Sequence, residues 1–242
     1  MAVDIKQQLG RSNLEEWVPQ SNLGKLVKDG KITDIDYILD RGLRIFEPEI
    51  VDMLVPQLHV ELLEVGQSKG KFGGGKSSIW KQTQKKTREG TTLKFSTFAV
   101  VGNKDGYVGI GYGDAKETVP AREKAIRQAK LHLIKIRRGC GAWDTGRPEA
   151  NSIPFQTMGK CGSVRVILYP APLGAGLRVQ KQCQKILELC GIRDVYSQTF
   201  GKTGTRLNLF RACFAALKHM SEVKVTDSFI SHAGMVEGRS SS

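Results

Sequence analysis

The chain has 242 residues, of which 40% are hydrophobic and 25% are charged, a composition that excludes an intrinsically disordered protein. Its formal net charge of +13 indicates a polyanionic partner, because so large a charge otherwise only repels itself. No apolar run approaches the roughly 18 residues of a membrane-spanning helix, and the segment 1–6 does not begin a secretory signal, so we expect a cytoplasmic protein without a membrane partner.

The charge is distributed unevenly along the chain. Residues 1–65 carry 7 Lys and Arg against 12 Asp and Glu, residues 66–138 carry 17 against 5, and residues 139–242 carry 13 against 7. We therefore expect the middle and C-terminal parts to meet the polyanion. The acidic N-terminal part should meet something else.

The N-terminal third divides into two predicted segments. Residues 1–65 form a helical extension, in which Leu23, Leu26 and Val27 share one apolar face and Ile35, Ile38 and Leu39 share another. Residues 66–91 are rich in Lys, Gly, Thr and Gln, a composition typical of an exposed basic loop.

Residues 92–146 are predicted to fold as a β-β-α unit. Apolar residues alternate from Phe95 to Val101, a turn follows at 103–106, and a return strand begins at Tyr107. The glycines at 109, 111 and 113 indicate a twisted edge or the close approach of another backbone. A helix from Thr118 should then end at the sequence Arg137-Arg138-Gly139.

Residues 147–224 are predicted to form a second α/β unit, followed by a disordered tail at 225–242. Its strands are expected near 164–168 and 195–200, with helices at 179–190 and from Asn208 onward. The predicted fold class is thus α+β, with two small α/β sandwich domains, a helical N-terminal extension and a disordered tail.

The sequence gives little support for a catalytic or metal-binding site. The segment 70–77 matches the phosphate-loop pattern G-x-x-x-x-G-K-[ST], but no helix period follows it and no strand ending in a magnesium-binding Asp is found. The five cysteines lack C-x-x-C spacing, and those at 183, 190 and 213 fall on apolar helical faces, which favours core packing. We expect no catalytic residue, metal, cofactor or small-molecule substrate.

The sequence resembles the archaeal and eukaryotic branch of the universal small-subunit ribosomal protein five family in a series of matches that occur in the same order. They cover roughly residues 22–222 and include the segments 23–32, 47–52, Val101-Gly-Asn-Lys-Asp-Gly-Tyr-Val-Gly-Ile-Gly-Tyr-Gly113, 137–139, 162–165, 170–176 and 191–195. The resemblance implies a double-stranded-RNA-binding-like domain followed by the family's second type of α/β domain.

The same resemblance implies a ribosomal role. It implies binding to small-subunit ribosomal RNA near the channel through which messenger RNA enters, with other small-subunit proteins as neighbours. It also associates a loop at about 87–92 with decoding accuracy. The sequence departs from the family there, since Thr91 and Thr92 stand where basic residues are usual and Lys94 is the nearest replacement.

The candidate RNA-binding residues are exposed basic residues at the ends of predicted elements and in loops, together with the turn and glycines of the predicted hairpin. They are Lys81, Lys85, Lys86, Arg88, Lys94, Asn103, Lys104, Gly106, Gly109, Gly111, Lys116, Arg137, Arg138, Arg178, Lys202 and Arg206. Two other functions remain open from the residues alone: a free double-stranded-RNA-binding regulator, and a nucleotide-using enzyme built on the segment 70–77.

Overall fold

The computed structural model describes residues 17–67, 75, 77–143 and 149–239. It divides into two compact units, residues 1–58 and residues 59–242, and each unit is described by itself.

The described residues of the N-terminal unit form three short helices, α2 (Asn22–Lys28), α3 (Ile35–Asp40) and α4 (Pro48–Leu54). Ser21 caps α2, because its hydroxyl accepts a hydrogen bond from the Gly24 amide at 3.0 Å. Burial would raise the pKa of Glu47, but hydrogen bonds from Ser21 and Gln20 outweigh it and lower that pKa. The carboxylate of Glu47 thus ties the segment before α2 to the start of α4.

The first sheet of the larger unit has the order β1-β5-β6-β7, with β4 also paired to β5. Its strands are β1 (His59–Leu63), β4 (Lys81–Thr87), β5 (Gly90–Gly102), β6 (Tyr107–Ala115) and β7 (Leu133–Lys135), and the pairings around β5 are antiparallel. Since β1 pairs with Phe98–Gly102 and β4 with Gly90–Ser96, these two strands follow one another along the same edge of β5. Two short strands between them, β2 (Gly66–Gln67) and β3 (Ser77–Ser78), pair with each other.

The second sheet has the order β11-β12-β10-β9 and comes from the C-terminal half of the chain. Its strands are β9 (Thr157–Cys161), β10 (Val164–Pro170), β11 (Leu177–Arg178) and β12 (Val195–Phe200). The helices α6 (Lys181–Cys190) and α7 (Arg206–Glu222) pack on the face that carries Val164, Val166 and Leu168. Gly191, with φ +83°, ends α6 in the left-handed conformation that glycine favours.

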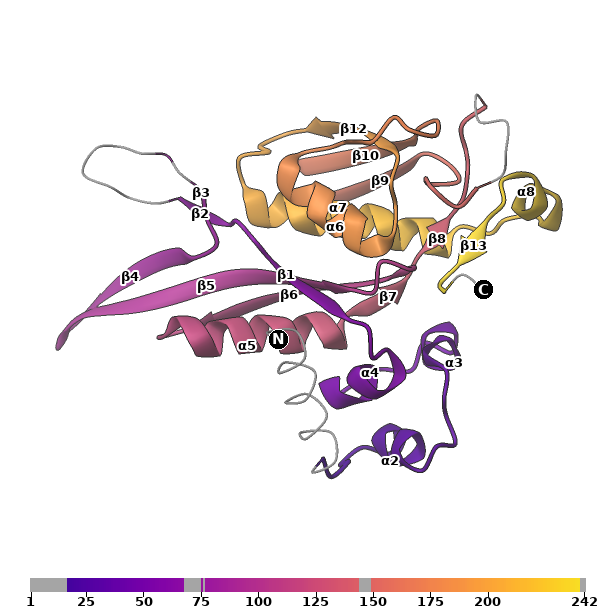
Figure 1. Ribbon diagram of the computed structural model, residues 1–242. Helices are drawn as coiled ribbons and strands as arrows, with labels where there is room; N and C mark the ends of the chain where they lie inside the picture. Colours follow the sequence, from indigo (N-terminus) through magenta and orange to yellow (C-terminus); the bar gives the residue numbers. More distant parts are fainter. Residues whose placement is uncertain (1–16, 68–74, 76, 144–148, 240–242) are drawn as a thin grey trace, which may run out of the picture. The chain divides into compact units, whose positions relative to one another are not determined.

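The two sheets share one core. One face of the first sheet is covered by α5 (Thr118–Leu131), and the other face meets α6 and α7, so that the layers are α5, first sheet, α6 with α7, and second sheet (Figure 1). Phe98 of β5 and Phe210 of α7 lie with ring centroids 5.5 Å apart inside this core. The predicted α+β fold with two α/β units is confirmed, and the units are joined by buried apolar contact.

The segment after α7 is ordered up to residue 239, so the predicted disordered tail is wrong. It contains α8 (Asp227–His232) and β13 (Val236–Glu237), which pairs with β8 (Arg137–Arg138). The Cys140 amide donates to the carbonyl of Ala233 at 2.8 Å, and the Gly238 amide donates to that of Ile136 at 3.0 Å. Backbone pairing to a distant strand holds a segment whose composition is otherwise typical of a loose terminus.

Three other predicted elements need correction. The helix from Thr118 ends at Leu131 and not at 137–139, because the following residues pair with β6 as β7. Residues 59–63 are a strand and not part of a helical extension. Within the predicted loop 66–91, residues 81–87 form β4, where threonines and cross-strand pairing favour an extended backbone.

Candidate nucleic-acid interface

β4 and the first part of β5 form a two-stranded ribbon that extends beyond the rest of the first sheet (Figure 1). β6 pairs with β5 only from Phe95 onward, so among the described strands none pairs with the outer part of the ribbon. All residues from 81 to 94 are exposed. We call residues 81–94 the arm.

The turn and the threonines of the arm explain how it is ordered without a core. Thr87 pairs with Gly90, which leaves Arg88 and Glu89 as a two-residue turn, and Gly90 has φ +127°. The hydroxyl of Thr87 donates to the Gly90 carbonyl at 2.9 Å, and the hydroxyl of Thr92 donates across the ribbon to the backbone carbonyl of Lys85 at 3.2 Å. The strand β5 continues into the sheet and anchors the arm there.

The arm concentrates positive charge, most of which is not paired with acidic side chains in the described part of the chain. It holds five Lys and Arg residues against the single acid Glu89. In its register Lys85 faces Thr92 and Lys86 faces Thr91, so each lysine lies opposite a neutral residue. Within the described part of the chain, no ion pair is formed by Lys81, Lys85, Lys86 or Arg88. These four cations are available to phosphate groups.

Lys94, at the base of the arm, is engaged by Asp114 of β6. Asp114 forms ion pairs with Lys94 and, at 3.4 Å, with Lys124 of α5. The hydrogen bond from Lys94 lowers the pKa of Asp114 despite partial burial, and the same bond raises the pKa of Lys94. Lys94 therefore contributes less free charge than its neighbours in the arm.

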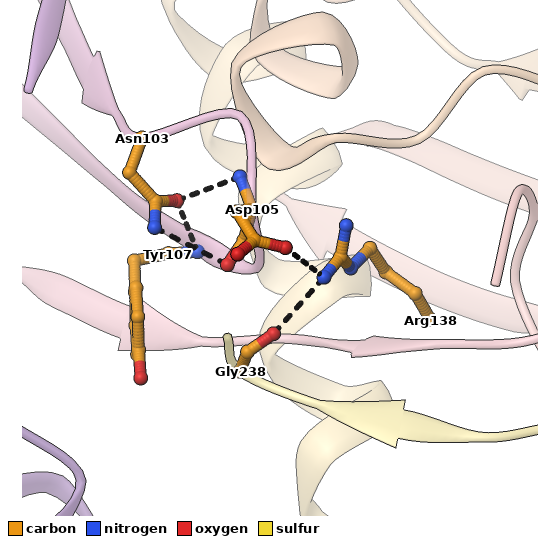
Figure 2. Close-up of polar contacts among 5 residues, drawn as sticks. All are labelled: Asn103, Asp105, Tyr107, Arg138 and Gly238. Atoms are coloured by element: carbon orange, nitrogen blue, oxygen red, sulfur yellow. Dashed lines mark hydrogen bonds and ion pairs between the residues drawn. The ribbon is translucent and has the colours of Figure 1, made fainter. Parts of the chain in front are cut away.

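The tip of the β5–β6 hairpin lies against α6 instead of projecting into solvent. The Lys104 amide donates to the carbonyl of Leu189 at 2.9 Å, and the Gly106 amide donates to that of Cys190 at 3.1 Å. The side-chain oxygen of Asn103 accepts from the amides of Asp105 and Tyr107, at 2.8 and 3.0 Å (Figure 2). Asn103 and Gly106 thus shape an internal turn, and only the Lys104 side chain is exposed.

The glycines of β6 make room for α5. A Cβ atom at Gly109, Gly111 or Gly113 would lie 2.1 Å from a carbonyl oxygen of α5, that of Ala129, Ala125 or Ala121 respectively. All three glycines are buried. The close backbone approach expected at these positions comes from the protein's own helix, so we no longer assign Gly109 and Gly111 to RNA.

Arg137 and Arg138 point into the protein and bind its C-terminal segment. Arg138 pairs with Asp105 at 2.5 Å and donates to the Gly238 carbonyl at 3.1 Å (Figure 2). Arg137 pairs with Glu237 and donates to the carbonyl of Val223. The side chain of Arg138 is only 8% exposed, because it lies between the hairpin tip and β13. The two arginines therefore stabilise the packing of the C-terminal segment against the rest of the unit.

The four remaining candidates are scattered. Arg206 is half-buried and donates to the carbonyls of Glu64 and Gly66, both at 3.2 Å, so it positions the chain between β1 and β2. Lys116, Arg178 and Lys202 are exposed. The structure also exposes Arg122, Lys124 and Arg127 on the outer side of α5, although they were not among the candidates.

Metal-ligand clusters, membrane spans, the phosphate-loop-like segment and the cysteines can each be located against the described residues. These residues include no cluster of three His, Cys, Asp or Glu side chains that could hold a metal. No helix in the described ranges is long and apolar enough to cross a membrane. Most of the phosphate-loop-like segment 70–77 lies outside the described residues. Cys183, Cys190 and Cys213 are buried, which confirms core packing.

A basic, exposed β-ribbon on a two-sheet α+β scaffold is typical of nucleic-acid-binding proteins. Two family profiles match the chain: Ribosomal protein S5, N-terminal domain, over residues 79–137, and Ribosomal protein S5, C-terminal domain, over residues 159–228. The first match begins just before β4, so the arm belongs to the family's N-terminal domain.

Similar curated proteins extend the match to nearly the whole chain. Small ribosomal subunit protein uS5 of Nanoarchaeum equitans is 49% identical over 226 residues, covering 93% of this chain and 97% of its own. Proteins of the same name from Methanocaldococcus jannaschii and Methanobrevibacter smithii are 43% and 44% identical, covering 95% and 92% of this chain and 99% and 98% of theirs. The chain belongs to the ribosomal protein S5 family, whose members are not enzymes.

Proposed function

We propose that this chain is a structural component of the small subunit of cytoplasmic ribosomes and that it binds small-subunit ribosomal RNA through the arm. The observation that carries the proposal is the exposed ribbon at 81–94, whose four unpaired cations are held on a defined backbone. Lys and Arg side chains on such a ribbon reach phosphates without being buried, and each contact releases counterions.

The finer part of the proposal concerns location within the subunit. We propose that the arm lies near the channel through which messenger RNA enters and that its turn, at residues 87–90, supports decoding accuracy. The support is the family resemblance together with the shape of the arm, since a narrow projecting ribbon can enter folded RNA where a compact sheet cannot. The exposed cations of α5 extend the basic surface beside it.

The N-terminal unit is proposed to contact neighbouring small-subunit proteins. Residues 1–58 carry 10 Asp and Glu against 7 Lys and Arg, so this unit is poorly suited to RNA. The described part of this unit also exposes several large apolar side chains, namely Leu26, Tyr37, Leu43, Phe46 and Met53. Exposed apolar groups within an acidic segment fit a basic protein partner better than a polyanion.

The test compares the salt dependence of RNA binding between charge-matched variants. The arm variant changes Lys85, Lys86 and Arg88 to Gln, and the control changes Lys181, Lys218 and Lys224 to Gln. Affinity for archaeal small-subunit ribosomal RNA is measured by filter binding from 50 to 300 mM KCl, with a generic RNA duplex as competitor.

Loss of three phosphate contacts should lower the slope of log affinity against log salt by about 2 in the arm variant only. Equal slopes for the two variants would refute the arm as the RNA contact. Equal affinity for the generic duplex and the ribosomal RNA would point to a free duplex-binding regulator and away from a ribosomal component.

A further inference from the structure

The outer face of the second sheet carries side chains of which only Arg178 was a candidate RNA-binding residue above. α6 and α7 pack on its inner face, and the alternate residues of β9, β10 and β12 point away from them. Exposure along this face is high for large side chains: 51% for Met158, 41% for Tyr196 and 45% for Phe200. Exposed apolar groups gathered on one sheet face indicate a binding surface.

The strand register arranges this face in three rows. The first row is Lys160–Arg165–Phe200, the second is Met158–Ile167–Gln198, and the third is Tyr169–Tyr196–Arg178. Directly opposite residues on paired strands lie about 5 Å apart at Cβ, so each row forms a continuous strip. Aromatic rings stand in the outer rows, and each of those rows also holds cations. We call these nine residues the platform.

Among the described residues, no acidic side chain pairs with the cations of the platform. Lys160 and Arg165 lie directly opposite each other, an arrangement that is unfavourable between like charges unless an anion lies between them. β9 to β12 contain no Asp or Glu at all, and Lys202 follows Phe200 by two residues. In the described part of the chain, none of Lys160, Arg165 and Arg178 forms an ion pair. The partner must supply the negative charge.

We infer that the platform binds a short single-stranded segment of RNA, with bases stacked on Tyr196 and Phe200 and phosphates held by Lys160, Arg165 and Arg178. Two features together favour RNA over a protein partner: cations in the first and third rows with no carboxylate on the strands of this face, and flat aromatic rings beside them in the same two rows. From the first row to the third, β10 advances four residues, or about 13 Å. Sheet-based RNA modules use such aromatic surfaces to stack two or three bases.

This inference concerns a surface separate from the arm, so the two can be tested independently. The experiment uses the full chain carrying the arm substitutions at Lys85, Lys86 and Arg88, which removes binding by the arm. A fluorescein-labelled single-stranded RNA octamer of mixed sequence is the probe, and fluorescence anisotropy gives its Kd. Tyr196→Leu with Phe200→Leu removes stacking but keeps apolar area, and Leu173→Ala is the control for an exposed apolar loss elsewhere.

Loss of two stacking rings should weaken binding of the octamer about 10-fold or more, whereas the control should stay within 2-fold. Lys160→Gln with Arg165→Gln should lower the salt slope by about 1.4. Thermal unfolding of each variant verifies that the sheet is intact. Unchanged octamer affinity in the leucine variant would overturn the inference. If that variant also failed to join small subunits, the platform would be a contact for a protein and not for RNA.

Discussion

Gly111 of β6 lies so close to α5 that a Cβ atom there would stand 2.1 Å from the carbonyl oxygen of Ala125. That oxygen belongs to helix backbone, which cannot move away without the helix. We therefore expect Gly111→Ala to lift α5 from the sheet and lower the free energy of unfolding by about 3 kcal/mol. Urea denaturation followed by far-ultraviolet circular dichroism measures this loss.

Gly204→Ala is the matched control, since a Cβ atom there meets nothing within 4 Å. Its free energy of unfolding should stay within about 0.5 kcal/mol of the parent protein. Equal stabilities for the two alanine variants would show that the helix does not rest on the glycines.

Arg138 is predicted to matter for stability and not for RNA binding. Its side chain is 8% exposed, and Arg138→Ala removes both its ion pair with Asp105 and its hydrogen bond to the Gly238 carbonyl. Breaking such a pair should lower the free energy of unfolding by about 3 kcal/mol. The exposed Arg193→Ala should cost no more than about 0.5 kcal/mol.

The salt slope of RNA binding by folded Arg138→Ala should equal that of the parent protein. A slope smaller by about 1, with stability unchanged, would return Arg138 to the RNA interface.

The difference between sequence and structure at Arg138 has a physical cause. Charge and position along the chain indicate that a residue is basic, but they do not reveal a partner 33 residues away, such as Asp105, or 100 residues away, such as Gly238. The arm's cations were identified correctly as exposed, because a run of polar residues without an apolar period has no face to bury.

The glycines of β6 likewise show that the sequence does not reveal which distant segment a residue contacts. Their pattern predicted a close approach by some backbone, but the approaching partner, α5, follows from tertiary packing. The alternation of β5 and the period of α5 were local signals and gave the correct elements, whereas the end of α5 and the ordered C-terminal segment depend on pairing with β6 and β8.

Asp114 is predicted to restrain RNA binding at the base of the arm. Asp114→Asn frees Lys94 and Lys124, so affinity for ribosomal RNA should rise and the salt slope should increase by about 1 to 2. Glu117→Gln makes the same change in net charge without freeing either lysine. An equal gain in both variants would mean that only net charge acts.

The same ion pair should be visible in the pH dependence of folding. The folded pKa of Asp114 is depressed by the hydrogen bond from Lys94, so its stabilisation is complete above the ordinary aspartate pKa and is lost as pH falls through the folded value. Carboxyl chemical shifts from NMR titration should give a midpoint below 3.8 in the parent protein. Lys94→Gln should move that midpoint upward, and an unmoved midpoint would exclude the pair in solution.

The buried thiols should be unreactive in the native protein. Burial raises the pKa of Cys190 far above its ordinary value, and a hydrogen bond with Cys183 together with burial raises that of Cys213. With Cys140 and Cys161 changed to Ser, the native protein at pH 8 should show no rapid reaction with Ellman's reagent. Three thiols should appear on denaturation, and rapid native reaction would contradict the packing of α6 against α7.

The most direct test of the arm as an RNA contact is hydroxyl-radical probing from its turn. Glu89→Cys, in a Cys161→Ser background, is modified with an iron chelate and assembled into archaeal small subunits, and Ser228→Cys on α8 is probed in parallel. The arm position should cleave ribosomal RNA strongly within one confined region. Cleavage no stronger than from a protein without the introduced cysteine would contradict the central claim that the arm lies in RNA.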